Sequence, residues 1–301
     1  MKTTAPFNMQ KKIWFLAFLT AVISVFFSFM GAPFLRTLFA KTKSVWFWAL
    51  GVVTVAILFS VQLTLGAVYV GAVWMTLGAY SELETRGVSW KKTSVISLIA
   101  GLLFAVLSFS WATKGSLTSD VAKSLVEPFL TSLQQFYPDN TFKAEQIIQY
   151  MPGILLSALM CSLAMGLVFE TQIFQLFQFR REKTASSLKW LEFRLPDSFI
   201  WFAFLGFFFS LVRLSILPEN VGIVVRMVAV NISIFSAFCF FLQGIVVFEF
   251  LSRFYRMGLF TKTIVYFLIL TWIGPAVGLM GLLDYWFNFR NLLRKKINEK
   301  N

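Results

Sequence analysis

The chain has 301 residues, of which 58% are hydrophobic and 14% are charged, and its mean hydropathy is +0.74. Because soluble globular proteins carry about 25% charged residues, this composition excludes a soluble enzyme, a disordered chain and a disulfide scaffold. The formal net charge of +13 is typical of basic residues held on the cytoplasmic side of a membrane and against anionic lipids. We expect membrane lipids as partners and no nucleic acid.

Apolar runs recur from one end of the sequence to the other. Each is near the roughly 20 residues that a helix needs to cross a bilayer, whereas a barrel would alternate apolar and polar residues in segments of about 10. The predicted fold class is therefore all-α, a polytopic transmembrane bundle of about eight or nine helices. We expect one integral membrane domain over residues 1–301 and a place in the bacterial inner membrane.

The first quarter of the chain predicts four helices. A basic start precedes an apolar run over 13–30, which we interpret as a first helix with its N-terminus in the cytoplasm. Gly31-Ala32-Pro33 then separates it from the stretch 34–40, which is either a short or a broken return helix. The apolar block 45–80 is too long for one span. We expect a break at its polar residues and close helix packing at its glycines, which are Ser60, Gln62, Thr64, Gly66, Gly71 and Gly78.

After a span over 94–111, the polar segment 114–150 follows. Its apolar residues form one stripe of an amphipathic helix, made of Val121, Leu125, Phe129, Leu133 and Phe136. The segment has no basic excess, which favours the external face of the membrane. It is either a lid over an outward-facing cavity or a helix that lies on the membrane surface.

The second half of the chain continues with Pro152 opening a span over 153–179 and with a strongly basic loop that ends at Arg194. Further spans are expected over 198–214, 221–250 and 264–283, the last one broken at Gly274-Pro275. The basic loop should be cytoplasmic. The basic tail over 285–301 is external if the last stretch crosses the membrane, and cytoplasmic if Gly274-Pro275 turns the chain back.

Three motifs in the last hundred residues resemble the YybS-like family of bacterial membrane proteins of unknown function. Their key residues are Arg194, Pro196 and Asp197, then Gln243 and Gly244, and finally Gly281, Asp284, Trp286, Phe289 and Arg290. That family is remotely similar to the S-components of energy-coupling-factor transporters. The resemblance implies an S-component-like core, small-solute binding, and a transmembrane coupling subunit with ATPases as partner, but it does not identify the ligand.

Two other groups of residues suggest where such a protein would act. Ala17 and Ala21 have the Ala-x-x-x-Ala spacing that S-components use for docking, and small residues four apart let a second helix approach closely. The corner Arg213, Glu219 and Arg226 lies at the outer ends of two helices joined by a short turn. It is either a clamp for an anionic ligand or a pair of snorkelling arginines. Asn231 lies deeper and either lines a cavity or bonds a neighbouring helix.

The sequence shows no catalytic constellation. The absence of histidine removes histidine bases and histidine metal ligands, and Cys161 and Cys239 lie within apolar runs as small hydrophobes. We therefore expect no enzyme, no cofactor and no metal site. The predicted function is a solute-binding, transport-related membrane protein, and the alternative is a scaffold or accessory subunit of a cell-envelope complex.

Overall fold

The computed structural model describes residues 5–26, 28–113, 123–124, 126–127, 130–131, 134–135, 144–179, 193–212, 218–255, 257–258, 261, 264–265, 268–269 and 274–291. Every regular element within these ranges is a helix, so the all-α prediction is confirmed. The chain forms two compact units, 1–188 and 189–301, and each is described by itself. The expectation of one integral domain stays a prediction.

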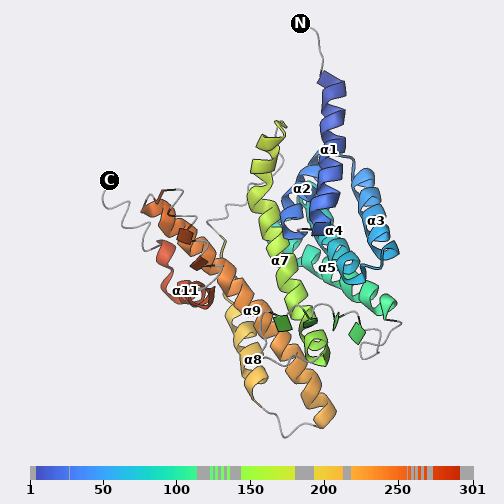
Figure 1. The fold of residues 1–301 in the computed structure, drawn as a ribbon. Helices are drawn as coiled ribbons and strands as arrows, with labels where there is room; N and C mark the ends of the chain where they lie inside the picture. The colour runs from blue at the N-terminus through green and yellow to red at the C-terminus, as the bar shows by residue number, and fades with distance from the viewer. Residues whose placement is uncertain are drawn as a thin grey trace. The chain divides into compact units, whose positions relative to one another are not determined.

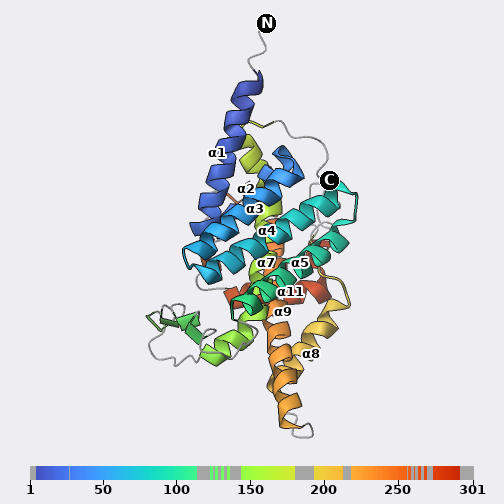
Figure 2. The same cartoon turned by 90° about the vertical axis from the view of Figure 1, so that its right-hand side faces the viewer.

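The N-terminal unit is a bundle around one central helix (Figures 1 and 2). Its helices are α1 (Ala5–Phe26), α2 (Ser28–Lys41), α3 (Ser44–Ser60), α4 (Thr64–Thr85), α5 (Trp90–Ala112) and α7 (Ala144–Leu176). The central helix α4 packs against α2, α3, α5 and α7, while α1 packs on α2 and α2 packs on α7. The core of the unit therefore surrounds α4.

The first helix ends earlier than the sequence indicated. The helix α1 stops at Phe26 and α2 already begins at Ser28, so Gly31 and Pro33 lie inside α2. Pro33 is the sixth residue of α2, beyond the first four residues whose backbone donors lack a helical acceptor, so the helix gives up one hydrogen bond there. A Cβ on Gly31 would lie 2.8 Å from Ser24 Cα. The Gly-Ala-Pro sequence is therefore used for close packing of α2 on α1 and not for a break. The stretch 34–40 is helical as part of α2, and its return across the membrane stays a prediction.

The break within the apolar block 45–80 lies where the polar residues predicted it. The helix α3 ends at Ser60 and α4 begins at Thr64. Gln62 has φ 60°, a left-handed conformation that side chains with a Cβ adopt at a cost. The turn thus depends on a backbone conformation that terminates α3.

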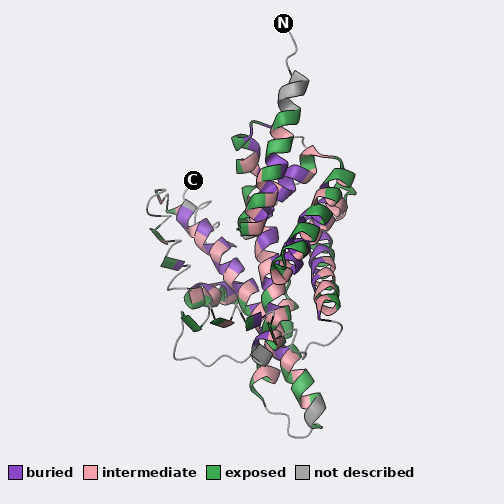
Figure 3. Cartoon of the chain, turned by 45° about the vertical axis from the view of Figure 1, so that its right-hand side comes forward, coloured by how far each residue is buried: buried purple, intermediate pink, exposed green. Residues whose placement is uncertain are grey.

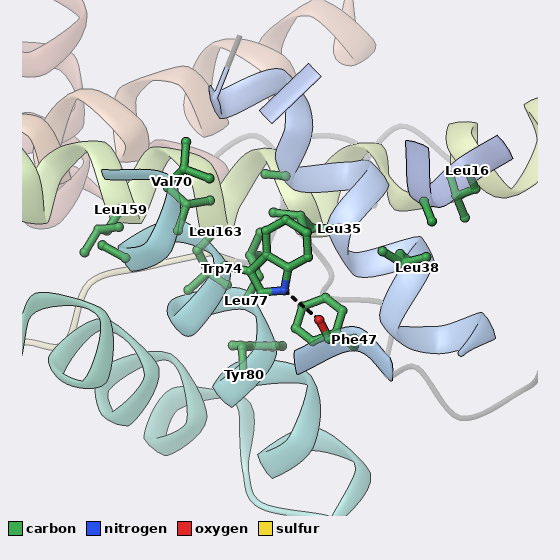
Figure 4. Close-up of a cluster of buried hydrophobic side chains, with 14 of the residues drawn as sticks. Leu16, Leu35, Leu38, Phe47, Val70, Trp74, Leu77, Tyr80, Leu159 and Leu163 are labelled. Carbon is green, nitrogen blue, oxygen red and sulfur yellow. Dashed lines mark hydrogen bonds between the residues drawn. The ribbon is translucent and has the colours of Figure 1, made fainter. Parts of the chain in front are cut away.

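Aromatic residues from α3 and α4 fill the centre of the core (Figure 4). The Trp74 indole donates a hydrogen bond to the Phe47 backbone oxygen at 3.2 Å, and the two rings lie 5.4 Å apart. A Cβ on Gly51 would lie 2.7 Å from Trp74 Nε1, and one on Gly78 would lie 2.8 Å from Phe47 Cε1. These glycines make room for the rings, which confirms the packing role expected of Gly78.

The helix α7 runs through Pro152 from Ala144 to Leu176. The sequence predicted that Pro152 opens a span over 153–179, and this was wrong, because the helix begins eight residues before the proline. One helical turn can lose the hydrogen bond that proline cannot donate when the helix on both sides of it is otherwise intact. The residues of the amphipathic stripe predicted in 114–150 lie outside the described residues, but their neighbour Val126 is helical and completely buried.

The C-terminal unit contains α8 (Phe199–Leu211), α9 (Glu219–Phe254) and α11 (Gly274–Phe287). Both α8 and α11 pack on α9, which with 36 residues is about 54 Å long. The sequence Gly274-Pro275 forms the start of α11, as expected where proline occupies the first helical turn. The basic loop over 180–192 and the tail beyond residue 291 lie outside the described residues.

Within the described residues, three helical segments are both long and apolar enough to cross a membrane, namely 90–112, 147–176 and 221–252, and α3 and α8 are shorter apolar helices. Large hydrophobic side chains are exposed on α5 and α8, among them Leu107, Trp111, Trp201 and Leu211. Figure 3 shows exposed residues beside buried ones along the helices. Apolar faces of this extent are typical of contact with lipid.

Candidate functional site

The N-terminal unit contains a cavity of about 590 Å³ between α4, α5, α7 and the segment around Val126. It lies at the start of α4, the end of α5 and the first half of α7. Its lining residues are Leu65, Gly66, Val68, Tyr69, Ala105, Val106, Phe109, Val126, Ile147, Ile148, Met151, Pro152, Ile154, Leu155 and Ala158. Ligand pockets commonly have volumes of about 300–1,000 Å³, so the space suits a small molecule.

The cavity wall is almost entirely apolar. The one polar side-chain group among its lining residues is the Tyr69 hydroxyl, which lies 3.4 Å from Ser162 Oγ. A small residue contributes to the volume of the cavity. A Cβ built on Gly66 would have Leu63 Cβ as its nearest neighbour, at 3.9 Å. Gly66 therefore lines open space, unlike Gly71 and Gly78, which confirm the predicted close packing.

Val126 connects the polar segment 114–150 to this cavity. Its side chain is completely buried and lies in the cavity wall. A helix that lay only on the membrane surface would place its apolar side chains in lipid. Val126 is thus one residue of this segment that lies in the cavity wall, and the choice between a lid and a helix on the membrane surface stays a prediction.

A buried ion-pair network joins α2, α4 and α7 near the opposite end of α4 and α7. The Arg36 Nε donates to Glu170 Oε2 at 3.0 Å, and its Nη2 donates to Glu84 Oε2 at 2.5 Å. A longer contact of 3.5 Å joins Nη1 to Ser81 Oγ, and the guanidinium lies over the Tyr80 ring, 5.1 Å from its centroid. Arg36 is 3% exposed. The guanidinium thus holds three helices together away from solvent.

The three C-terminal motifs converge on a second buried polar cluster in the C-terminal unit. Asp284 Oδ2 accepts hydrogen bonds from Arg290 Nη2 at 2.8 Å and from Gln243 Nε2 at 3.3 Å. The Gln243 Oε1 accepts the backbone N–H of Leu195 at 3.2 Å, and Arg290 Nη1 donates to the Phe193 oxygen at 2.7 Å. The cluster therefore pins the segment before α8 to both α9 and α11.

Arg194 and Asp197 strengthen the same connection. Arg194 Nη2 donates to the Tyr285 backbone oxygen at 3.4 Å and lies 3.6 Å from Asp197 Oδ1, while the Tyr285 hydroxyl donates to the Asp197 backbone oxygen. Pro196 and Trp286 are exposed and Phe289 is half-buried. The pair Arg194–Asp197 is local, whereas both contacts with Tyr285 join the segment before α8 to α11, so the geometry of the family motif supports a structural role.

Two motif glycines bring α9 and α11 into backbone contact. A Cβ on Gly244 would lie 2.8 Å from the Val277 carbonyl carbon, and one on Gly281 would lie 2.7 Å from Gly244 N. Side chains larger than hydrogen are therefore excluded at this crossing. Small residues of this kind let membrane helices pack closely, and here they place Gln243 next to Asp284.

The predicted anionic clamp is only partly visible. Arg213 lies outside the described residues, as does the side chain of Glu219, although Glu219 begins α9. Arg226 is exposed on α9. Asn231 donates to the Met227 oxygen of its own helix at 2.8 Å, so this bond is not part of a ligand site. The clamp stays a prediction.

The two alanines of the proposed docking pair on α1 differ in their burial. Ala17 is buried in the hydrophobic core, whereas Ala21 is half-buried. Exposed side chains on the same helix are Trp14, Phe15 and Phe18. A partner helix on the outer face of α1 would therefore contact these aromatic residues, and docking through the alanine pair stays a prediction.

The residues that the sequence did not single out are those of the cavity and of the Arg36 network. Neither Arg36 nor Glu170 belongs to a motif or a periodic pattern in the sequence. An ionisable residue within an apolar run is the signal that could have identified both. Their pairing could not be deduced, because Arg36 and Glu170 lie 134 positions apart.

A comparison with family models places most of the chain in one alignment. Residues 13–285 match the model of a family described as predicted membrane protein, DUF2232. This description agrees with the resemblance carried by the C-terminal motifs and names no activity. Neither a curated protein nor a solved structure matches the chain, so the likeness to S-components rests on the sequence resemblance alone.

Proposed function

We propose that this chain, which belongs to the DUF2232 family of predicted membrane proteins, binds an apolar or amphiphilic small molecule in the cavity between α4, α5 and α7. The observation that carries the proposal is the cavity of about 590 Å³ with its apolar wall. It lies in the unit that contains two of the three membrane-crossing segments.

The chemistry of the wall selects the class of ligand. A charged group in this space would lose its water without gaining a partner, which is costly. Each methylene group of an acyl or isoprenoid chain would instead gain about 0.8 kcal/mol on leaving water. The Tyr69 hydroxyl and Ser162 offer one polar contact, enough for the hydroxyl or carbonyl of an otherwise apolar ligand.

The transport-related part of the proposal concerns what happens to the bound molecule. In an S-component-like protein the solute is bound by one membrane subunit and released through a coupling subunit with ATPases. The sequence resemblance and the size of the cavity support this transport-related role. Co-purification of such a subunit from native membranes is the expected result, whereas a stable partner without ATPases would favour the scaffold or accessory role.

A photoreactive fatty alcohol with a diazirine in its alkyl chain tests the binding. The purified protein in lipid nanodiscs is labelled by light, and the attachment sites are mapped by mass spectrometry. We expect the label on cavity residues of α7 such as Met151 and Leu155. Ala158→Phe fills the cavity and should reduce this labelling at least tenfold, since the phenyl ring occupies the space of the chain.

Matched variants separate specific binding from contact with lipid. Ala164→Phe on the same helix places a ring away from the lining residues and should leave labelling unchanged. Arg226→Ala should also leave it unchanged, because that exposed arginine is not part of the cavity wall. Labelling spread evenly over the lipid-facing residues of α5, with no effect of Ala158→Phe, would refute the proposal.

A further inference from the structure

We propose that the end of α4, together with the starts of α3 and α5, binds the headgroup of an anionic phospholipid through Lys43, Arg86, Lys91 and Lys92. We call these four residues the basic corner. The basic corner lies at the opposite end of α4 and α5 from the cavity, so the inference does not rest on the function proposed above.

Short connections bring the three parts of the basic corner together. The helices α3 and α5 both pack on α4, and residues 86–89 alone join α4 to α5. On α4, the Glu82 carboxylate accepts a hydrogen bond from the Ser44 hydroxyl at the start of α3 and another from Arg86 Nη2 at 3.2 Å. The start of α3 therefore lies next to the end of α4, and the short loop holds the first turn of α5 at the same place.

The basic corner presents an excess of positive charge. All four of its cations are exposed, and the first turns of α3 and α5, both fully described, contain no acid. On α4, Glu82 pairs with Arg86, while behind the surface Glu84 and Glu170 share Arg36 and add one further negative charge. The exposed cations outnumber these acids, so the surface attracts anions, as basic groups between membrane helices attract lipid headgroups.

Apolar side chains next to the basic corner favour a lipid over a soluble anion. Trp46 in the first turn of α3 is 60% exposed, and the Lys91 ammonium lies 5.8 Å from the centroid of the Trp90 ring. Tryptophan is enriched at the headgroup level of a bilayer. Exposed apolar side chains then continue along the first turns and the middle of α3 and α5, namely Val45, Val52, Val53, Ile57, Val95, Ile96 and Ile99. A phospholipid held by its phosphate at the basic corner can lay its acyl chains on them.

The charge of the headgroup decides which phospholipid fits. The phosphate of phosphatidylcholine is balanced by the choline of the same headgroup, whereas the phosphate of phosphatidylglycerol leaves one net negative charge. Lysine ammonium groups on flexible stems bind phosphate as mobile point charges. The lysines of the basic corner therefore favour a headgroup with a net negative charge, such as that of phosphatidylglycerol.

Native mass spectrometry of the full chain in detergent tests the site with phosphatidylglycerol and phosphatidylcholine of identical acyl chains. We expect the wild type to bind phosphatidylglycerol about tenfold more tightly than phosphatidylcholine. The triple change Lys43→Gln, Lys91→Gln and Lys92→Gln should remove this preference without altering the affinity for phosphatidylcholine. Arginine at the same three positions should keep the preference, because it keeps the charge.

Lys123→Gln is the matched control, because Lys123 lies in the same segment as Val126 of the cavity wall and should not affect the preference. Inorganic phosphate added in excess should not displace the lipid, since it makes no apolar contacts.

Equal affinity of the wild type for both lipids, an unchanged preference in the triple glutamine variant, or displacement by inorganic phosphate would overturn the proposal. If size-exclusion chromatography shows that the triple variant is not folded, the double change Lys91→Gln and Lys92→Gln decides by the same comparison.

Discussion

Replacement of Gly281 by alanine should destabilise the crossing of α9 and α11. A Cβ at this position would lie 2.7 Å from Gly244 N and closer still to the Phe240 carbonyl oxygen. Both neighbours are backbone atoms, so no side-chain rotation can relieve the overlap. The two helices must separate until both distances exceed 3.0 Å, the limit below which real Cβ contacts essentially never occur.

The expected magnitude follows from two opposing effects. Alanine in a helix is favoured over glycine by about 1 kcal/mol. Overpacking a close contact costs about 1–3 kcal/mol, and separation of the helices also stretches the hydrogen bond of 3.3 Å between Gln243 and Asp284, with a buried polar group left unsatisfied at about 1–3 kcal/mol. The overlap therefore outweighs the propensity, and we expect a net loss of about 2 kcal/mol.

Gly278→Ala supplies the matched control. It lies three residues earlier on α11, and its Cβ would find Phe241 N at 4.0 Å, which is ordinary contact. This variant should be neutral or gain up to about 1 kcal/mol. Thermal unfolding in detergent, followed by tryptophan fluorescence, measures both. Equal stability of Gly281→Ala and Gly278→Ala would refute the argument that the backbone contact limits this crossing.

Three further substitutions test other parts of the fold. Arg290→Met leaves Asp284 as a buried charge without its ion pair and should cost about 3–5 kcal/mol of unfolding free energy; a second change, Asp284→Asn, should recover part of this loss, and no recovery would contradict the ion-pair argument. Gln62→Gly relieves a left-handed residue at φ 60° and should gain about 1 kcal/mol in chemical denaturation, whereas Gln62→Ala should gain nothing. Trp74→Phe removes the hydrogen bond to the Phe47 oxygen and should lower the unfolding free energy by about 1 kcal/mol, so unchanged stability would count against that bond.

The sequence predicts those features of the fold that depend on neighbouring residues. The turn between α3 and α4 follows from three polar residues in an apolar block, and the start of α11 follows from Gly274-Pro275. Prolines in the sequence predicted helix breaks that the structure does not have, because tertiary packing outweighs the local preference. Pro33 and Pro152 lie inside helices, because the contacts on both sides of each proline outweigh one lost hydrogen bond.

The polar clusters could not be predicted because they join distant positions. The sequence resemblance identified Gln243, Asp284 and Arg290 as a motif, but only the fold shows that they bond one another and the backbone of Leu195. For Arg36 there was no motif at all. Its two carboxylate partners lie 48 and 134 positions away, and no periodicity relates residues at such separations.

The glycines of α4 explain why the cavity lies at the start of this helix. Within a bilayer, lipid tails are as apolar as leucine, so small residues and polar bonds decide which helix faces close up. At Gly71 and Gly78 the neighbouring Phe104 and Trp48 fill the space that the missing side chain leaves, whereas among the described residues no side chain of another helix comes within 4 Å of a Cβ built on Gly66. The Arg36 network ties α4 to α7 near Glu84 and Glu170. Nothing comparable joins the two helices among the described lining residues at the Gly66 end beyond the contact of Tyr69 with Ser162, so the space between them stays open to an apolar ligand.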